Sequence, residues 1–356
     1  MQTTTSFRWR KTLAAVAAVI MAFTVAACGN ANNNAENNTQ NGQASQETPT
    51  KEPTKLRLGY LNVMDDAQTI LAYRADLYKK HGIDAEMQMF TSGTDLIKAI
   101  VGGQIDAGVL GFTNALSWLD KGADLKIVGA AQTGYHSMLV GKDSEVTSLD
   151  QLKGKSVASQ KEGSTADVVL NGVVWSKAGF TKQDVTMQYV SPAVAIQSLA
   201  AGKVDAAFVF EPYSSIAKLS YDANEIYEIG KDWPFPCMVV IASGDLVNNK
   251  KEAMYQMLDA QKEAIEMLEN DPAKAAKLIT DDFITEDTIT KADGSTVPAE
   301  EVIKASIESQ EFNWELTEQD IARMDEVGQM MVDQGILEKK PDVNAALDLS
   351  WQQQNQ

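Results

Sequence analysis

The fold is decided by the stretch Leu96-Ile97-Lys98-Ala99-Ile100-Val101-Gly102-Gly103-Gln104-Ile105-Asp106-Ala107, because a second version of it follows 99 residues later. That second version reads Ala195-Ile196-Gln197-Ser198-Leu199-Ala200-Ala201-Gly202-Lys203-Val204-Asp205-Ala206. Each version is an amphipathic helical pattern that stops at glycine and leads through an Asp-Ala pair into a short apolar strand. Repetition at a fixed interval indicates two copies of one structural unit.

The same order of elements surrounds both stretches. The first copy predicts strands at 56–60, 85–90 and 108–111, with helices near 67–80 and 95–101. The second copy predicts strands at 156–160, 185–190 and 207–210. Strands that alternate with amphipathic helices are typical of parallel sheets covered on both faces. The sequence therefore predicts an α/β protein in two lobes, each with a mixed, mostly parallel sheet.

In sheets of this kind a ligand lies beyond the carboxyl ends of the strands. The loops there form the candidate site, and several lead into helices whose free N–H groups attract anions. The other interpretation is that the Ser, Thr and Asp residues only cap helices. With the aromatic Tyr135 from the region between the copies, the candidate ligand-binding residues are Asn62, Asp65, Ser92, Gly93, Thr113, Asn114, Tyr135, Gly163, Ser164, Thr165, Ser191, Glu211 and Tyr213.

The charged residues in these loops indicate which charge the solute carries. Lys161 is their one basic residue, beside Asp65, Asp66, Glu162 and Glu211. Carboxylates repel a bare anion and pair with an ammonium group. The alternative is that Asp65 and Asp66 cap a helix and that Glu211 makes contacts between the lobes.

The N-terminal segment is predicted to direct export of the chain. Arg8, Arg10 and Lys11 precede an uncharged apolar run at 12–27, which is typical of a signal peptide. The run closes on Thr24-Val25-Ala26-Ala27-Cys28-Gly29, which resembles a bacterial lipobox, so Cys28 is the expected lipidation site. Residues 28–54 are polar and are predicted to be a disordered tether. The alternative is an ordinary secretory signal with an incidental cysteine.

Composition excludes several functions. A formal net charge of −18 argues against nucleic acid and anionic membranes as partners. The chain has two histidines and none of the HExxH, CxxC, GxGxxG or GxSxG motifs, so no enzyme and no cofactor are predicted. The carboxylate pairs at 65–66 and 281–282 lack EF-hand spacing, so no metal site is predicted. Cys237 is expected to be a buried free thiol.

Several motifs together resemble one family, the nitrate/sulfonate/taurine-type substrate-binding lipoproteins of ABC importers. They are Phe90-Thr91-Ser92-Gly93, Gly103-Gln104-Ile105-Asp106-Ala107-Gly108, Leu149-Asp150-Gln151-Leu152-Lys153-Gly154-Lys155-Ser156-Val157, Gly202-Lys203-Val204-Asp205-Ala206 and Glu211-Pro212-Tyr213. The resemblance covers roughly residues 55–355. It departs at Phe210, where the family often has tryptophan.

The resemblance implies a periplasmic binding protein-like type II fold with two hinge crossings. Lobe one would comprise 55–141 plus 242–356, including the C-terminal helices, and lobe two would comprise 142–241. The hinge strands would be 136–140 and 238–242, and the lobes would close on the solute.

The resemblance also implies a function and partners. The chain would be a monomeric, extracytoplasmic lipoprotein, anchored by Cys28 to the outer face of the cell membrane, that delivers solute to an ABC permease with its ATPase. The expected solute is a small organic anion or zwitterion, sulfonate-like or taurine-like. The alternatives are nitrate or bicarbonate, an amine-bearing heterocycle such as a thiamine-precursor pyrimidine, and a ligand-sensing lipoprotein not coupled to import.

Overall fold

The structure is a computed structural model that describes residues 52–356, and Lys51–Gln356 forms one compact unit. The predicted signal peptide at 1–27, Cys28 and most of the predicted tether lie outside the described residues. The tether was predicted to extend to residue 54, but Thr54 already belongs to the first strand and donates its backbone N–H to Gly82 O at 2.8 Å.

The larger sheet has six strands in the order β13-β4-β10-β3-β1-β2. β1 pairs in parallel with β2 and β3, whereas β10 runs antiparallel between β3 and β4. Its strands are β1 (Thr54–Leu61), β2 (Ile83–Phe90), β3 (Ala107–Gly111), β4 (Leu125–Thr133), β10 (Pro236–Ser243) and β13 (Glu311–Phe312). The helices that follow or cover these strands are η1 (Met64–Asp66), α1 (Ala67–Arg74), α2 (Leu77–Lys80), α3 (Gly93–Val101), α4 (Phe112–Leu119), α10 (Gly244–Asn249), α11 (Lys251–Asn270) and α12 (Pro272–Phe283).

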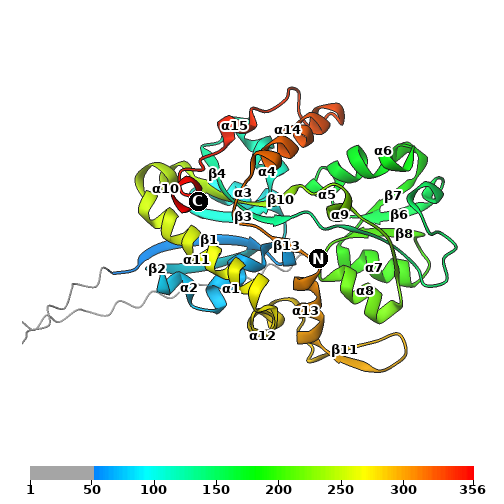
Figure 1. Ribbon diagram of the computed structural model, residues 1–356. Coiled ribbons are helices and arrows are strands. Elements are labelled where there is room, and N and C mark those ends of the chain that lie inside the picture. The colour runs from blue at the N-terminus through cyan, green and yellow to red at the C-terminus, as the bar shows by residue number, and fades with distance from the viewer. Residues whose placement is uncertain (1–51) are drawn as a thin grey trace, which may run out of the picture. The chain divides into compact units, whose positions relative to one another are not determined.

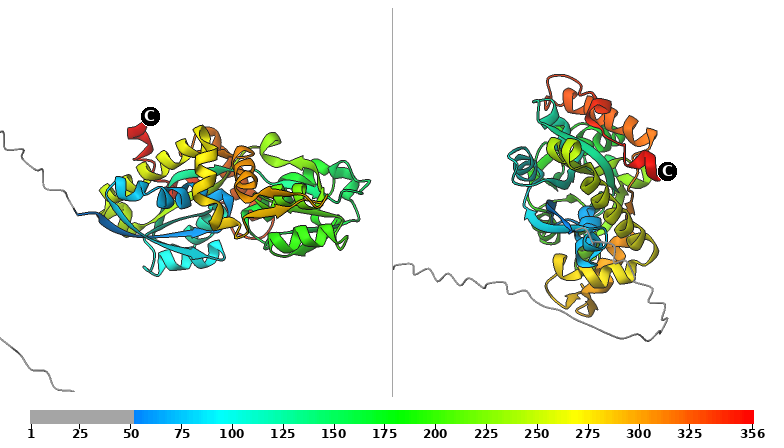
Figure 2. Two further views of the ribbon diagram at one scale, coloured as in Figure 1. Left: turned by 90° about the horizontal axis from the view of Figure 1, so that it is seen from below. Right: turned by 90° about the vertical axis from the view of Figure 1, so that its left-hand side faces the viewer.

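The smaller sheet has five strands in the order β7-β6-β8-β5-β9 and lies beside the larger one, coloured mostly green in Figures 1 and 2. Its strands are β5 (Ser137–Val140), β6 (Ser156–Ser159), β7 (Thr186–Tyr189), β8 (Ala206–Val209) and β9 (Asn224–Glu228). Its helices are η2 (Leu149–Leu152), α5 (Thr165–Val169), η3 (Leu170–Val174), α6 (Trp175–Ala178), η4 (Lys182–Asp184), α7 (Pro192–Ala200), α8 (Tyr213–Tyr221) and α9 (Ile229–Asp232). The predicted two-sheet α/β fold is confirmed, although β10 and β5 make the antiparallel share larger than expected.

The repeated aspartates perform the same task in both sheets. Asp106 Oδ2 accepts the Arg57 backbone N–H at 2.8 Å, and Arg57 also binds this carboxylate through its guanidinium. Asp205 Oδ2 accepts the Ser156 backbone N–H and hydroxyl, both at 2.7 Å. Both aspartates precede a central strand, so each ties the start of β3 or β8 to the neighbouring parallel strand, β1 or β6. The repeat in the sequence is therefore a repeated hydrogen-bonded junction between parallel strands.

Two short segments carry the chain between the sheets. The first crossing, 134–136, joins β4 to β5, and the second crossing, 233–235, leads into β10. They are hydrogen bonded to each other, because Gly134 N–H donates to Phe235 O at 2.7 Å. A β-carbon at position 134 would lie 2.2 Å from the Phe235 ring, so this close approach requires glycine.

The crossings lie one strand earlier than the predicted lobe boundaries. Strand β5 pairs within the smaller sheet and β10 within the larger sheet. The predicted boundaries at 141/142 and 241/242 would instead place β5 in lobe one and most of β10 in lobe two. A buried apolar strand has the same residue pattern whether it ends a lobe or begins one, so the pattern could not place the crossing. The division of the chain at those boundaries stays a prediction, and strand pairing favours 134–136 and 233–235.

The C-terminal elements contact both halves, whereas the sequence predicted packing on lobe one. Helix α14 contacts α4 and α5, and α13 contacts α12 and α8. Gln334 Nε2 donates to Val168 O at 2.9 Å, and the Arg323 guanidinium lies 4.5 Å from the Trp233 ring centroid. The remaining elements are β11 (Thr288–Thr290), β12 (Thr296–Pro298), α13 (Ala299–Glu308), α14 (Glu318–Asp333), α15 (Val343–Ala346) and α16 (Gln352–Asn355).

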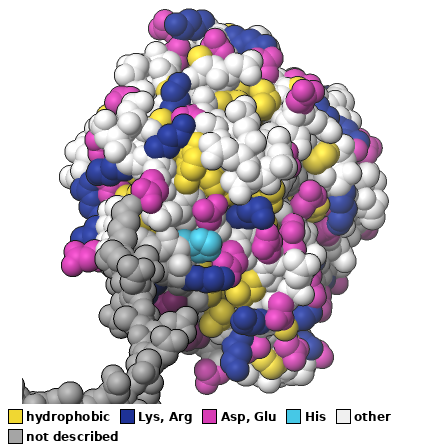
Figure 3. Space-filling model, turned by 60° about the vertical axis from the view of Figure 1, so that its left-hand side comes forward, with side chains coloured by type: hydrophobic (Ala, Val, Ile, Leu, Met, Phe, Trp, Pro, Cys, Tyr) yellow, Lys and Arg dark blue, Asp and Glu magenta, His cyan; other side chains and the backbone are white. Residues whose placement is uncertain are grey.

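The surface is mixed in charge. On the face shown in Figure 3, acidic and basic side chains are interspersed and no continuous basic patch forms. Within residues 52–356, no helix is both long enough and apolar enough to cross a membrane.

The Asp106 junction predicts a pH-dependent loss of stability. Burial alone would raise the pKa of the Asp106 carboxyl, but the hydrogen bonds from Arg57 outweigh it and hold the pKa below its ordinary value. Replacing a charged acceptor by a neutral one, as in Asp106→Asn, is expected to lower the free energy of unfolding at pH 7 by about 1–2 kcal/mol. Because the folded pKa is lowered, the difference should shrink as pH falls below about 4 and vanish below the lowered pKa. Urea unfolding at several pH values measures it, with the exposed Asp143→Asn as control. A difference that did not change with pH would contradict this account.

Candidate functional site

Three of the predicted loops meet across the boundary between the sheets. The hydroxyls of Thr113, after β3, and Thr165, after β6, lie 2.8 Å apart. A β-carbon at Gly111 would lie 2.5 Å from Thr165 Oγ1, and one at Gly93 would lie 2.9 Å from Asn114 Nδ2. The structure thus brings these loops together at the carboxyl ends of the strands, as the topology predicted.

The three predicted serines are helix N-caps. Ser92, Ser164 and Ser191 accept backbone N–H groups from residues three positions later, at 3.2, 3.3 and 3.4 Å. The capping interpretation therefore describes what these hydroxyls do in the structure. What remains for a solute at these positions is the helix N-terminus itself, with its exposed N–H groups and positive dipole end.

Other predicted residues lie apart from this meeting point or make structural contacts. Asn62 and Ser191 are exposed. Gly163 donates its N–H to Asp167 Oδ2 at 2.9 Å and adopts a φ of +77°, which explains the glycine. Tyr135 donates to Glu311 Oε2 at 3.4 Å, and the Tyr213 ring packs edge-on against Phe210 at 5.8 Å.

Glu211 makes the contacts between parts of the chain that the alternative interpretation expected. It is buried, and its two oxygens accept hydrogen bonds from Ser215 N–H and Ser309 Oγ, both at 3.1 Å. Burial raises the pKa of this carboxyl above its ordinary value. It also borders a cavity of about 80 Å³, lined by Tyr135, Ser137, Glu211, Lys218, Glu225, Glu228, Lys231 and Ser309.

The structure separates the two aspartates of the first loop. Asp66 Oδ2 accepts the Leu61 backbone N–H at 2.7 Å, so Asp66 closes the turn after β1. Asp65 is 2% exposed, and its Oδ1 has no hydrogen-bond partner among the described residues. Asp66 Oδ1 is unpaired as well, but the Asp66 carboxylate is held by its own loop through Oδ2, whereas no hydrogen bond from the Asp65 side chain to another residue of its loop is found among the described residues.

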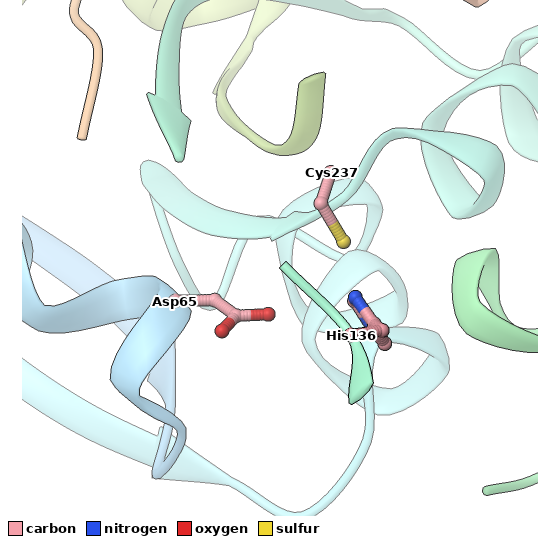
Figure 4. Close-up of side chains that lie close together, drawn as sticks. All are labelled: Asp65, His136 and Cys237. Atoms are coloured by element: carbon pink, nitrogen blue, oxygen red, sulfur yellow. The ribbon is translucent and has the colours of Figure 1, made fainter. Parts of the chain in front are cut away.

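Two residues absent from the predicted site lie beside Asp65. One oxygen of Asp65, a ring nitrogen of His136 and the sulfur of Cys237 all lie within 4.8 Å of one another (Figure 4). His136 ends the first crossing and Cys237 follows the second, so the pairing of the crossings brings them together. The available signal was their position in the sequence, since His136 begins one predicted hinge strand and Cys237 directly precedes the other. These are the side chains that could hold a metal ion.

Burial sets the protonation of this cluster. It raises the pKa of Asp65 to about 7, assisted by repulsion from Glu211, and lowers the pKa of His136 to about 4. Burial also raises the pKa of the Cys237 thiol well above its ordinary value, as do the charges of Asp65 and Asp66. The charged groups that act on the cluster are thus further carboxylates, and burial favours the neutral form of each member.

Aromatic rings enclose the histidine. The His136 ring stacks on Phe208 at 5.5 Å and contacts Phe210 at 5.8 Å and Phe235 at 6.4 Å, measured between centroids. These rings fix the orientation of the imidazole and exclude water from one side of the cluster.

Several buried polar groups follow strand ends in both sheets. In Gln68, Ser159, Gln160 and Ser214, at least one buried side-chain N or O atom has no hydrogen-bond partner among the described residues. Gln68 comes after β1, Ser159 and Gln160 end and follow β6, and Ser214 comes after β8. Each unpaired buried group costs about 1–3 kcal/mol, so those that follow strand ends are candidates for contact with a ligand. The sequence did not single out these residues.

Comparisons with known proteins agree with this geometry. A Brucella abortus (strain 2308) protein named as a binding protein is 26% identical over 270 residues, which are 73% of this chain and 82% of that protein. An Escherichia coli (strain K12) protein named for binding aliphatic sulfonates is 30% identical over 168 residues, 46% of this chain and 51% of that protein. The alkanesulfonate-binding protein SsuA from Xanthomonas axonopodis pv. citri, solved bound to MOPS, matches with a TM-score of 0.70 and 26% identity, covering 84% of this chain and all of that one.

These matches are to binding proteins and not to enzymes, as the sequence predicted. The fold is that of the α/β periplasmic binding proteins. The NMT1-like family matches residues 49–280, which is more than half of the sequence, and the chain belongs to this family.

Proposed function

We propose that this protein is the extracytoplasmic solute-binding component of an ABC importer, which captures a small organic anion or zwitterion between its two sheets and delivers it to a permease with its ATPase. The observation that carries the proposal is the set of unpaired buried polar groups at the strand ends of both sheets. A polar solute held there would supply the hydrogen bonds that Gln68, Gln160 and Ser214 lack.

The chemistry of the edge favours a solute with an anionic end. Helix α3 follows β2, α4 follows β3, and α7 follows β7 in the second copy, as α3 follows β2 in the first. The N-terminus of each helix therefore lies at the carboxyl end of a strand, and such termini bind anions. Names of relatives support the same class, since the Escherichia coli and Xanthomonas proteins are named for sulfonates. A sulfonate such as taurine fits both observations, because its ammonium group would offset the carboxylate of Asp65.

A second candidate is an amine-bearing heterocycle, such as a thiamine-precursor pyrimidine. It is favoured by the aromatic rings of Phe210 and Tyr213, which contact each other, stand on either side of Glu211-Pro212 in the sequence and could stack on a planar ring. Bare nitrate or bicarbonate is disfavoured by those carboxylates.

The solute class is tested by thermal unfolding of the purified chain with taurine, ethanesulfonate, nitrate, bicarbonate and an aminopyrimidine. A solute that binds only the folded state stabilises it by about 2.7 kcal/mol at a hundredfold excess over its Kd. We expect a large upward shift with taurine, a smaller one with ethanesulfonate and none with nitrate. A shift with the aminopyrimidine alone would select the second candidate, and a shift with none of the five would overturn the assignment of solute class.

The role of the unpaired groups is tested with Ser214→Ala. Because its hydroxyl is buried without a partner among the described residues, its removal should leave solute-free stability unchanged or raise it slightly, while solute affinity falls about tenfold. Ser306→Ala is the matched control, since that buried hydroxyl donates to Val302 O at 2.9 Å and lies in α13. The control should lose some stability and keep full affinity. Calorimetric titration and urea unfolding measure the two quantities, and equal affinity in both variants would contradict the proposed site.

We further propose that acylated Cys28 anchors the protein to the outer face of the membrane, with the polar segment after it as a tether. A thioether-linked lipid requires the cysteine sulfur, so Cys28→Ser should move the protein from the membrane fraction to the soluble fraction. Fractionation of producing cells, with Cys237→Ser as control for loss of a thiol, tests the anchor. Retention of the Cys28→Ser protein in the membrane fraction would argue for another anchor, and recovery of the unaltered protein in the soluble fraction would argue for the ordinary secretory alternative.

A further inference from the structure

We propose that one divalent transition-metal ion, such as Zn²⁺, binds to Asp65, His136 and Cys237 at the point where the two crossings meet. This site goes beyond the proposed solute capture and does not depend on it, but it uses the Asp65 carboxylate, so a bound ion and a solute ammonium group would compete for that carboxylate. It was not predicted from the sequence, where the paired carboxylates were considered only for calcium and Cys237 only as a buried thiol.

The geometry comes from three separate parts of the chain. Asp65 lies in η1 after β1, His136 ends the first crossing, and Cys237 is the second residue of β10. Figure 4 shows the Asp65 carboxylate and the Cys237 sulfur both directed toward His136. Their donor atoms lie within 4.8 Å of one another, and tetrahedral zinc with its usual bond lengths needs about 3.3–3.6 Å between donors. Closing the remaining distance requires side-chain movements of about 1 Å.

The donors suit a borderline metal. A thiolate, an imidazole and a carboxylate are the three ligand types that zinc uses, whereas calcium and magnesium prefer oxygen alone. The set leaves one tetrahedral position open, as in sites with three protein ligands. Each side chain is 2% exposed, and aromatic rings surround the histidine, so the ion would lie in a shielded, low-dielectric site.

Hydrogen bonds to other protein groups do not satisfy the polar atoms of this cluster. Asp65 Oδ1 and His136 Nδ1 are both buried without a hydrogen-bond partner among the described residues. The charged side chain that acts on Asp65 is Glu211, a second carboxylate, so the local field favours a cation. A metal ion would join the first loop of the larger sheet to both crossings and would stiffen the connection between the sheets.

The test exploits the composition of the chain, which has two cysteines and two histidines. In a Cys28→Ser background, Cys237 is the single thiol, so a thiolate-to-cobalt charge-transfer band in the near ultraviolet reports on that sulfur alone. The purified protein is treated with chelator, dialysed, kept reduced and titrated with Co²⁺, which is then displaced with Zn²⁺. We expect one Co²⁺ per chain, the charge-transfer band, and loss of the band on addition of Zn²⁺.

Variants locate the other ligands. Cys237→Ser should abolish the band, and His136→Gln and Asp65→Asn should each weaken Co²⁺ binding about 10–100-fold or more. His81→Gln is the matched control, because it removes the other histidine, which pairs with Glu263 at 2.9 Å, and it should leave binding unchanged. Circular dichroism without metal checks that each variant folds.

Absence of the band at saturating Co²⁺ in the Cys28→Ser protein would overturn the proposal without any further variant. Binding that survives in Cys237→Ser, or that is lost in His81→Gln, would overturn it as well by assigning the metal to the surface. No solute is present in these measurements, so a failure here leaves the proposed solute capture untouched.

Discussion

The hydrogen bond between the two crossings is the constraint on which the rest of the structure depends. Gly134 N–H donates to Phe235 O at 2.7 Å, and the Phe235 ring occupies the space that a larger residue at 134 would need. This contact sets the distance between the sheets and therefore where their strand ends face each other. It also brings His136 and Cys237 together, although 101 positions separate them in the chain. Both proposed sites follow from a backbone contact that itself binds nothing.

A cost in stability accompanies this arrangement. Buried polar atoms usually find partners, yet Asp65, Gln68, His136 and Ser214 each keep one that has none among the described residues. Natural proteins break such local rules chiefly at functional sites and make up the difference elsewhere. Here the compensation lies in the apolar core beneath both sheets and in junctions such as that between Arg57 and Asp106. The unpaired groups at the strand ends are consistent with the proposed solute site.

The sequence was sufficient for the parts of the fold that repeat. Helix periodicity and the paired Gly-x-(Ile/Val)-Asp-Ala motifs located the three parallel strands of each copy within one or two residues, and the strand-end loops meet as expected. It was insufficient where position depends on a contact distant in sequence. The predicted helix at 67–80 is broken by Asp76 in a left-handed conformation. The short strand β13, which pairs with β4, was not predicted at all.

The candidate site, too, could be predicted from the sequence only in part. Loops adjacent to strands could be identified from topology, but which side chains in them face inward could not, and the serines proved to be caps. His136 and Cys237 were missed because neither belongs to a strand-end loop, and their proximity depends on how the crossings pair.

The contacts of the C-terminal helices with the smaller sheet also bear on how long a solute stays bound. If release requires the sheets to separate, the hydrogen bond from Gln334 to Val168, the stacking of Arg323 on Trp233 and the bond from Ser309 to Glu211 must loosen first. The contacts made by Gln334 and Arg323 involve no candidate solute-binding residue, so they add the same barrier to the release of every solute. Residence times of different solutes would then share a common lower limit that the chain imposes, and hand-over to a permease would depend on a partner able to loosen these helices.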